Sequence, residues 1–198
     1  MKKKVVIIGC GGHGKVVADI IKKSGDIVEG FLDDYNDSFP GVIGRIDDCV
    51  KYEDCCFVIA IGDNDTRQKI QRKYGDLKFY TAIHPCAVIG ENVSIGNGTV
   101  VMANAVINSD TMIGMHCIIN TGSTVEHDNK ISDFVHVSPG AVLCGTVSVG
   151  EKTHIGAGAV VINNISIEKN TVVGAGAVVV KNIENSGTYI GVPAMERK

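Results

Sequence analysis

One histidine of the sequence stands directly between two carboxylates. The order is Glu126-His127-Asp128, and it follows the aliphatic residue Val125. Histidine titrates near neutral pH, so it can take a proton from an attacking amine or alcohol. A carboxylate on the second ring nitrogen would fix the tautomer and stabilise the imidazolium. The run therefore predicts a general base, His127. The alternative is an exposed turn histidine that has no role.

A glycine-rich loop near the start of the chain has the spacing of a phosphate-binding loop. The pattern Gly9-x-Gly11-x-x-Gly14 follows an apolar run and precedes a helical one, so its backbone N–H groups would face a phosphate at a helix N-terminus. An acid stands about 20 residues further on, at Asp33 or Asp34, where a dinucleotide fold reads a ribose hydroxyl. By this pattern alone, the loop could bind NAD.

Two features favour a sugar nucleotide over NAD. The α/β part has only about 80 residues, which is short for the six-stranded fold of a dehydrogenase. His13 and Lys15 add polar and cationic groups beside the loop, and these suit the diphosphate of a sugar nucleotide. A loop with a purely structural role is the third interpretation. The predicted contacts of the nucleotide sugar are Gly11, Gly12, His13, Lys15, Asp33, Asp34, Gly62 and Asn64.

Gly62 and Asn64 belong to this set because they follow a predicted strand. Ligands of open α/β sheets bind beyond the carboxyl ends of the strands, so both residues should lie near the glycine loop. The helix that follows should be capped by Asn64 or Asp65. Arg67, one turn into that helix, is expected at the surface.

The elements that must position these residues change in character near residue 83. Before it, strands and helices are predicted to alternate, at residues 4–9, 15–23, 27–32, 57–61 and 64–74. The first, third and fourth segments are short apolar runs, and the other two have apolar residues at helical spacing. This alternation predicts a small parallel sheet in a Rossmann-like α/β domain over residues 1–82.

After residue 83 the chain follows a six-residue period. Every sixth residue is aliphatic, without interruption, at Ile83, Ile89, Ile95, Val101, Ile107, Ile113, Ile119, Val125, Ile131, Val137, Leu143, Val149, Ile155, Val161, Ile167, Val173 and Val179. The residue four positions later is mostly small or β-branched, as at Ala105 and Thr111. These hexapeptide repeats predict a parallel β-helix over residues 83–198, with aliphatic residues inside and small residues at the corners of a coil of about 18 residues.

Five other histidines compete with His127 for a role. His84 precedes a proline at the domain junction and is predicted to be structural. His116 and His154 fall at turn or strand-end positions and are expected at the surface. His136 is half a coil beyond His127, hence on another side of the prism, so the two could meet only across an interface between chains.

Composition and charge exclude several classes of function. The net charge is −3 and no basic run continues beyond the first four residues, which argues against nucleic-acid binding. No apolar stretch approaches the roughly 18 residues needed to span a bilayer. The seven cysteines are an odd number and no pair has the two-residue gap of a zinc knuckle, so we expect reduced thiols, no metal site and a cytoplasmic protein.

The whole chain resembles the bacterial sugar acyltransferase family that includes the acetyltransferase of bacillosamine biosynthesis and the sialic-acid O-acetyltransferase. The stretches that carry the resemblance are GCGGHGK (residues 9–15), FLDD (31–34), AIGDN (60–64), NTGSTVEHD (120–128), HVSPG (136–140) and GVPA (191–194). The resemblance implies a left-handed β-helix and a homotrimer. It also implies transfer from acetyl-CoA to nitrogen on a UDP-linked 4-amino-4,6-dideoxy sugar, in bacterial glycan biosynthesis.

The resemblance also assigns roles to single residues. It makes His127 the base and either Asp128 or Glu126 its orienting acid, because relatives often carry glutamate where this chain has the shorter Asp128. His136 would line the acceptor or thioester region, and the Gly145 N–H would hold the thioester carbonyl. The acetyl-CoA contacts implied are His136, Gly145, Ala157, Ala175 and Pro193. O-acetylation of a sialic-acid-like sugar and a catalytically inactive sugar-nucleotide binding module remain the alternatives.

Overall fold

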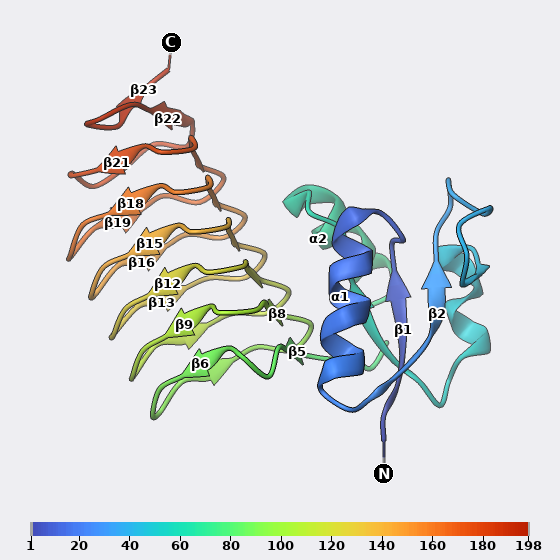
Figure 1. Cartoon of the computed structure of the whole chain (residues 1–198). Coiled ribbons are helices and arrows are strands. Elements are labelled where there is room, and N and C mark those ends of the chain that lie inside the picture. The colour runs from blue at the N-terminus through green and yellow to red at the C-terminus, as the bar shows by residue number, and fades with distance from the viewer. Residues whose placement is uncertain (1, 198) are drawn as a thin grey trace.

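The computed structural model describes residues 2–197 as an α/β domain followed by a β-helix (Figure 1). The first domain contains β1 (Lys4–Ile8), α1 (Gly12–Lys23), β2 (Ile27–Leu32), β3 (Val42–Gly44), the 3-10 helix η1 (Ile46–Lys51), β4 (Cys56–Ile59) and α2 (Asn64–Lys73). Its four strands are parallel, in the order β3-β2-β1-β4. The predicted parallel sheet is therefore present, with the glycine loop directly after its central strand β1.

Both helices of this domain begin near the predicted positions, with differences at their first turns. Helix α1 begins at Gly12, three residues earlier than expected, so the glycine loop itself forms the first helical turn. The predicted cap of α2 was wrong by one residue. The cap is Asp63, whose carboxylate accepts a hydrogen bond of 2.8 Å from the Thr66 N–H.

The rest of the chain winds into a parallel β-helix whose strands form three sheets. The eight-stranded sheet contains β5 (Ala82–Ile83), β8 (Val100–Val101), β11 (Ile118–Ile119), β14 (His136–Val137), β17 (His154–Ile155), β20 (Val172–Val173), β22 (Thr188–Ile190) and β23 (Met195–Glu196). The six-stranded sheet contains β6 (Val88–Ile89), β9 (Val106–Ile107), β12 (Thr124–Val125), β15 (Val142–Leu143), β18 (Val160–Val161) and β21 (Val178–Val179). The five-stranded sheet contains β7 (Ser94–Ile95), β10 (Met112–Ile113), β13 (Lys130–Ile131), β16 (Ser148–Val149) and β19 (Ser166–Ile167).

The six-residue column of aliphatic residues fills the inside of this prism, as predicted. From Val101 to Val179 its members are at most 4% exposed. Ile89 differs, at 37% exposure, because it lies in the first coil and has no coil beneath it. The small residues of the second column, such as Ala105 and Thr111, are fully buried at the corners.

The α/β domain packs on the outward face of the eight-stranded sheet. Outward positions of a β-helix are usually polar, but here Val100, Met102 and Ile118 are apolar and at most 2% exposed. They share one hydrophobic cluster with Val17 and Ile21 of α1. Burial of these residues fixes the two domains against each other.

Candidate active site

His127 lies at the corner that follows β12, with its side chain 56% exposed. Its Nδ1 is 2.7 Å from Oδ2 of Asp128, which adopts the left-handed conformation (φ 59°) that the corner requires. Glu126 instead accepts a hydrogen bond of 2.8 Å from the Asn108 side chain, one coil below. Of the two acids flanking His127, Asp128 is thus the one that contacts the imidazole. In the tautomer that donates Nδ1–H to Asp128, Nε2 carries the lone pair.

Gly145 lies one coil above His127, directly beside its ring. A Cβ atom at this position would lie 2.7 Å from Nε2 and 2.6 Å from Cε1 of His127. Only glycine leaves the ring in place there. Within residues 2–197 the Gly145 N–H donates no hydrogen bond, whereas the next amide, Thr146 N–H, bonds His127 O at 2.9 Å. The corner thus combines an open imidazole nitrogen with a free backbone donor.

The glycine loop borders a pocket of about 440 Å³ at the carboxyl edge of the parallel sheet. Six of the eight predicted sugar-nucleotide contacts line it, namely Gly11, Gly12, His13, Asp33, Asp34 and Gly62. Lys15 is not among its lining residues, and its Nζ lies 5.1 Å from the Phe39 ring centre. His13 Nε2 is buried and has no hydrogen-bond partner within the described residues. Burial, and then the charge of Arg67, lower the pKa of His13 to about 4, so this ring is neutral.

The two aspartates of this pocket are already engaged by backbone groups. The carboxylate of Asp33 accepts hydrogen bonds from the N–H groups of Cys10 (2.9 Å), Tyr35 (2.9 Å) and Asn36 (3.1 Å). Burial alone would raise the pKa of Asp33, but these donors hold it below its usual value. Oδ1 of Asp34 accepts one bond of 3.0 Å, from Ile46 N–H. Asp33 therefore connects the glycine loop to the loop after β2 by hydrogen bonds. The sequence did not predict this structural role.

A second pocket of about 480 Å³ opens between the loop before α2 and the β-helix, and Gly62 and Asn64 line it with His136 and His154. The two imidazoles are stacked, with ring centres 4.7 Å apart. Nε2 of His136 is 3.0 Å from Nδ2 of Asn120. Burial, then the charges of His154 and Arg67, lower the pKa of His136 to about 3.

Three expectations about these side chains were wrong. His154 is half-buried in the second pocket rather than exposed, and its Nε2 lies 2.8 Å from the Ser138 hydroxyl. His116 is 1% exposed, because its ring packs between Phe79 (centres 4.4 Å apart) and Phe134 (5.3 Å). The third is Arg67, which is also 1% exposed.

The 18-residue length of one coil could have predicted the neighbours of His154 and His116. It separates His136 from His154 and His116 from Phe134, and residues so spaced lie above one another on successive coils.

Comparison with known proteins matches both parts of the chain. Residues 4–74 match the model of the PglD N-terminal domain, and residues 92–127 match the bacterial transferase hexapeptide model. A mutant perosamine N-acetyltransferase from Caulobacter crescentus, in complex with CoA and GDP-perosamine, is 39% identical, with a TM-score of 0.94 over 98% of this chain and 97% of that one. The acetyltransferase domain of PglB from Neisseria gonorrhoeae is 36% identical, with a TM-score of 0.93 over 99% and 100%.

The chain belongs to this family of hexapeptide-repeat sugar N-acetyltransferases. The left-handed β-helix implied by the resemblance is confirmed with it. UDP-N-acetylbacillosamine N-acetyltransferase of Bacillus subtilis is 42% identical over 114 residues, which are 51% of this chain and 52% of that protein. The match thus spans about half the length of this curated relative.

A single copy of this acetyltransferase does not bring all the predicted site residues together. His127 and Gly145 lie at the corner where the six-stranded sheet leads to the five-stranded one. The predicted acetyl-CoA contacts Ala157 and Ala175 form a column at another corner, where the eight-stranded sheet leads to the six-stranded one. Pro193 lies in the turn between β22 and β23, next to the start of β21. Gly176 N–H bonds Ala157 O at 2.9 Å, and Ala194 N–H bonds Val178 O at 2.8 Å. His136 begins a strand of the eight-stranded sheet, on a different side of the prism from His127, as predicted.

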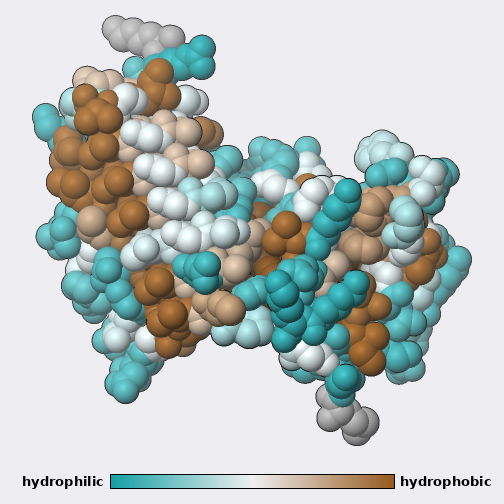
Figure 2. Space-filling model, in the orientation of Figure 1, coloured by the Kyte–Doolittle hydropathy of each residue, from teal (hydrophilic) through white to brown (hydrophobic). Residues whose placement is uncertain are grey.

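Between these two corners the acetyltransferase presents an apolar face. Five of the six outward positions of the six-stranded sheet are valines, at Val88, Val106, Val142, Val160 and Val178, and none of them is buried. We call these residues the valine face. The upper coils of the β-helix, at the left of Figure 2, carry the corresponding apolar surface. An uncovered sheet face of this kind is typical of an interface between chains.

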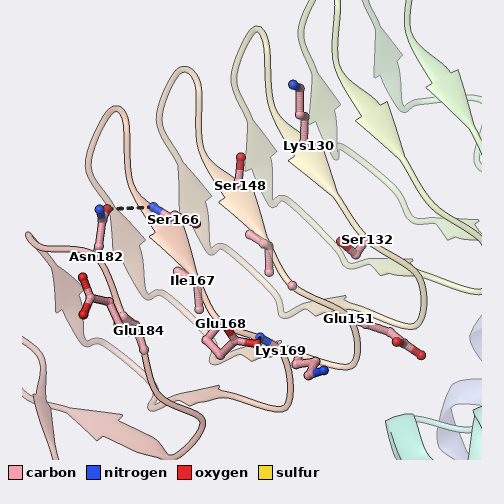
Figure 3. A pocket seen from close by; sticks show the side chains of 13 residues that line it. Lys130, Ser132, Ser148, Glu151, Ser166, Ile167, Glu168, Lys169, Asn182 and Glu184 are labelled. Carbon is pink, nitrogen blue, oxygen red and sulfur yellow. Dashed lines mark hydrogen bonds between the residues drawn. The ribbon is translucent and has the colours of Figure 1, made fainter.

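Another hollow of the acetyltransferase lies elsewhere, over the five-stranded sheet (Figure 3). It has about 620 Å³ and most of its lining residues are polar, with Lys130, Ser148, Ser166 and Glu168 among them. None of the predicted site residues lines it. Within residues 2–197, no helix is long and apolar enough to cross a membrane. In the same range, His, Cys, Asp and Glu side chains form no group of three that could hold a metal ion.

Proposed function

We propose that the protein transfers the acetyl group of acetyl-CoA to the amine of a nucleotide-linked 4-amino-4,6-dideoxy sugar. The observation that carries this is the His127 corner, where Asp128 holds Nδ1 and Nε2 lies beside Gly145, whose N–H donates no hydrogen bond within residues 2–197. The solved relatives support it, because one binds CoA and GDP-perosamine and the PglB acetyltransferase domain binds acetyl coenzyme A. The B. subtilis relative is named for a UDP-linked sugar.

The reaction uses the imidazole of His127 and the backbone N–H of Gly145. The amine nitrogen attacks the carbonyl carbon of the thioester while Nε2 of His127 takes a proton from it. The carbonyl oxygen becomes negative and accepts a hydrogen bond from Gly145 N–H. When the C–O double bond re-forms, the C–S bond breaks and the sulfur takes the proton from the imidazolium. The products are the acetylated sugar and CoA with a free thiol.

Asp128 acts through His127, by fixing its tautomer. We expect Asp128→Asn to lower kcat by about 10²-fold or more, because an amide in this place no longer favours the tautomer with a free Nε2. Glu126→Gln is the matched control, since Glu126 accepts a bond from Asn108 and does not contact the imidazole. Steady-state kinetics of both variants test the assignment. Equal losses in the two would contradict a specific role for Asp128.

The nucleotide sugar is assigned to the glycine-loop pocket. Its diphosphate would lie along the N–H groups of Gly11 and Gly12, and at the same place the buried Nε2 of His13, which has no hydrogen-bond partner within the described residues, would donate to it in the Nε2–H tautomer. The base would lie towards Asp33 and Asp34, as the family resemblance implies.

The double variant Asp33→Ala, Asp34→Ala should weaken nucleotide-sugar affinity by at least about 10-fold. It loses four hydrogen bonds to backbone N–H groups that shape the pocket. Acetyl-CoA affinity should stay unchanged, because its predicted contacts lie on the β-helix. Titration calorimetry with UDP, GDP and acetyl-CoA measures each affinity. Unchanged nucleotide affinity would show that the nucleotide sugar does not bind in this pocket.

The proposed function also includes a binding site for acetyl-CoA and self-association of the chain. The coenzyme arm would follow the column Ala157 and Ala175 and the turn at Pro193, and the valine face between this column and Gly145 would pack against a second copy. Three copies in a ring would bring the column of one chain to the His127 corner of its neighbour. The seven cysteines are all unpaired, which fits the reducing environment of the cytoplasm.

A comparison of acceptors tests the proposed function. Purified protein is incubated with acetyl-CoA and with UDP- or GDP-linked 4-amino-4,6-dideoxy sugars, or with a sialic acid, and products are identified by mass spectrometry. We expect one added acetyl group on a nucleotide-linked amino sugar, located on nitrogen by fragmentation. Acetylation of the sialic acid alone would replace the proposal with O-acetyl transfer. No product with any acceptor, together with no acetyl-CoA binding, would indicate an inactive binding module.

A further inference from the structure

Arg67 is buried at the junction of the two domains without a carboxylate partner. It is 1% exposed, and no Asp or Glu of the described residues lies within ion-pair distance. Burial lowers its pKa to about 10, so it stays charged at neutral pH. Burying an unpaired charge is unfavourable unless every donor is bonded. An apolar side chain would be enough to fill this space. The role of Arg67 therefore follows from the hydrogen bonds that its guanidinium makes.

Two of these bonds reach the β-helix. Nε donates to His116 O at 2.8 Å and Nη2 donates to Phe134 O at 2.9 Å. His116 and Phe134 are corner residues of successive coils, both in the left-handed conformation (φ 53° and 59°). Asn64 extends the series, because its Nδ2 donates to Lys152 O, on the next corner, at 2.9 Å. Through Arg67 and Asn64, helix α2 is therefore hydrogen-bonded to three consecutive coils of the β-helix, which fixes its position along them.

The other bonds of Arg67 hold the loop between β4 and α2. Nη1 donates to Ile61 O at 3.0 Å and to Gly62 O at 3.1 Å, and Nη2 donates to Asn64 Oδ1 at 2.7 Å. This loop is the wall that separates the two pockets, since Gly62 lines both. On one side lies the glycine loop, and on the other lie His136 and His154. One planar guanidinium therefore links this wall to the β-helix corners.

We propose that Arg67 is a positioning residue that sets the nucleotide-sugar pocket in fixed register with the β-helix, so that the amine of the sugar is presented to the acetyl donor. The inference rests on the proposed function for what the pocket binds. Arg67 itself contacts neither substrate in this arrangement. The register depends on five donors in one plane, which lysine cannot reproduce with a single ammonium.

The test compares Arg67→Lys with Gln68→Ala. Gln68 is the next residue of α2, is 7% exposed, and its side chain bonds Glu151 of the β-helix, with no hydrogen bond to residues 61–63. Arg67→Lys should raise the KM of the nucleotide amino sugar about 10-fold and lower kcat by up to about 10²-fold, the size expected when bound groups are misplaced by about 1 Å. The KM of acetyl-CoA should stay within about two-fold. Gln68→Ala should lower the thermal stability without changing either KM.

Hydrogen exchange provides a readout that does not need turnover. Arg67→Lys should speed amide exchange in residues 61–66 while the β-helix coils beyond residue 155 keep wild-type protection. If Arg67→Lys does not fold, Asn64→Ala removes one acceptor of Arg67 and the bond to Lys152 O, and should give the same pattern more weakly. Unchanged loop exchange and unchanged KM values in the folded variant would overturn the proposal. If wild-type protein acetylates no nucleotide sugar, the proposed function fails, and loop exchange still decides the role of Arg67.

Discussion

Replacement of His127 by alanine should lower acetyl transfer by about 10²–10⁴-fold, the usual contribution of a general base. The side chain is the only imidazole at its corner among the described residues, and its Nε2 faces Gly145 rather than a protein partner. Acetyl-CoA affinity should be almost unchanged, because no predicted coenzyme contact other than Gly145 touches this ring. Single-turnover acetyl transfer and calorimetry with acetyl-CoA measure the two quantities separately.

His127→Gln provides the matched variant, because glutamine approximates the size of the ring without its basicity. We expect it to be as slow as His127→Ala. Full turnover by either variant would refute His127 as the base. A parallel loss of acetyl-CoA affinity would show that the histidine binds the coenzyme rather than moving a proton.

Replacement of Gly145 by alanine should lower kcat by about 10²-fold in a protein that still folds. The added methyl would lie 2.7 Å from Nε2 of His127, closer than real side chains approach, so the ring must leave its bond with Asp128 or the corner must shift. The backbone of Gly145 is not in the left-handed region, so the substitution brings no conformational strain of its own. Either shift separates the base from the proposed oxyanion donor.

Ser109→Ala is the control for this effect, because Ser109 lies one coil below His127 in the same column and its side chain makes no hydrogen bond within residues 2–197. Thermal unfolding and steady-state kinetics of both variants separate folding from catalysis. Wild-type kcat in Gly145→Ala would show that neither the ring position nor this amide matters for transfer.

The β-helix was predictable because its signal is redundant. Each aliphatic position repeats every six residues, so one wrong position would not hide the register, and the burial from Val101 to Val179 follows it. His127 was identifiable for the same reason, since a regular register marks the residues that must face outward. The choice between Glu126 and Asp128 was not predictable, because it depends on the backbone conformation of the corner and on Asn108 of the coil below.

Arg67 was misplaced because a charged residue in a short polar helix normally faces solvent. Its acceptors, His116 O and Phe134 O, lie 49 and 67 residues away and are backbone atoms, so no residue type in the sequence marks them. Asp33 was placed in the nucleotide pocket from its spacing, but the bonds that it accepts from backbone N–H groups depend on how two loops meet. Long-range backbone contacts of this kind leave no pattern in the sequence.

His127 lies at the corner away from the eight-stranded sheet on which the α/β domain packs. The proposed function therefore requires that the sugar pocket of one chain present its amine to the His127 corner of a neighbour. The most direct measurement is acetyl transfer at low sugar concentration by trimers co-assembled from His127→Ala chains and Asp33→Ala, Asp34→Ala chains, each variant alone being expected to retain at most about a tenth of wild-type activity. Random assembly of equal amounts pairs an intact corner with an intact neighbouring pocket at about a quarter of the sites, so we predict about a quarter of wild-type activity. Activity no higher than the mean of the two variants measured separately, in trimers shown by mass spectrometry to contain both chains, would contradict a site shared between chains.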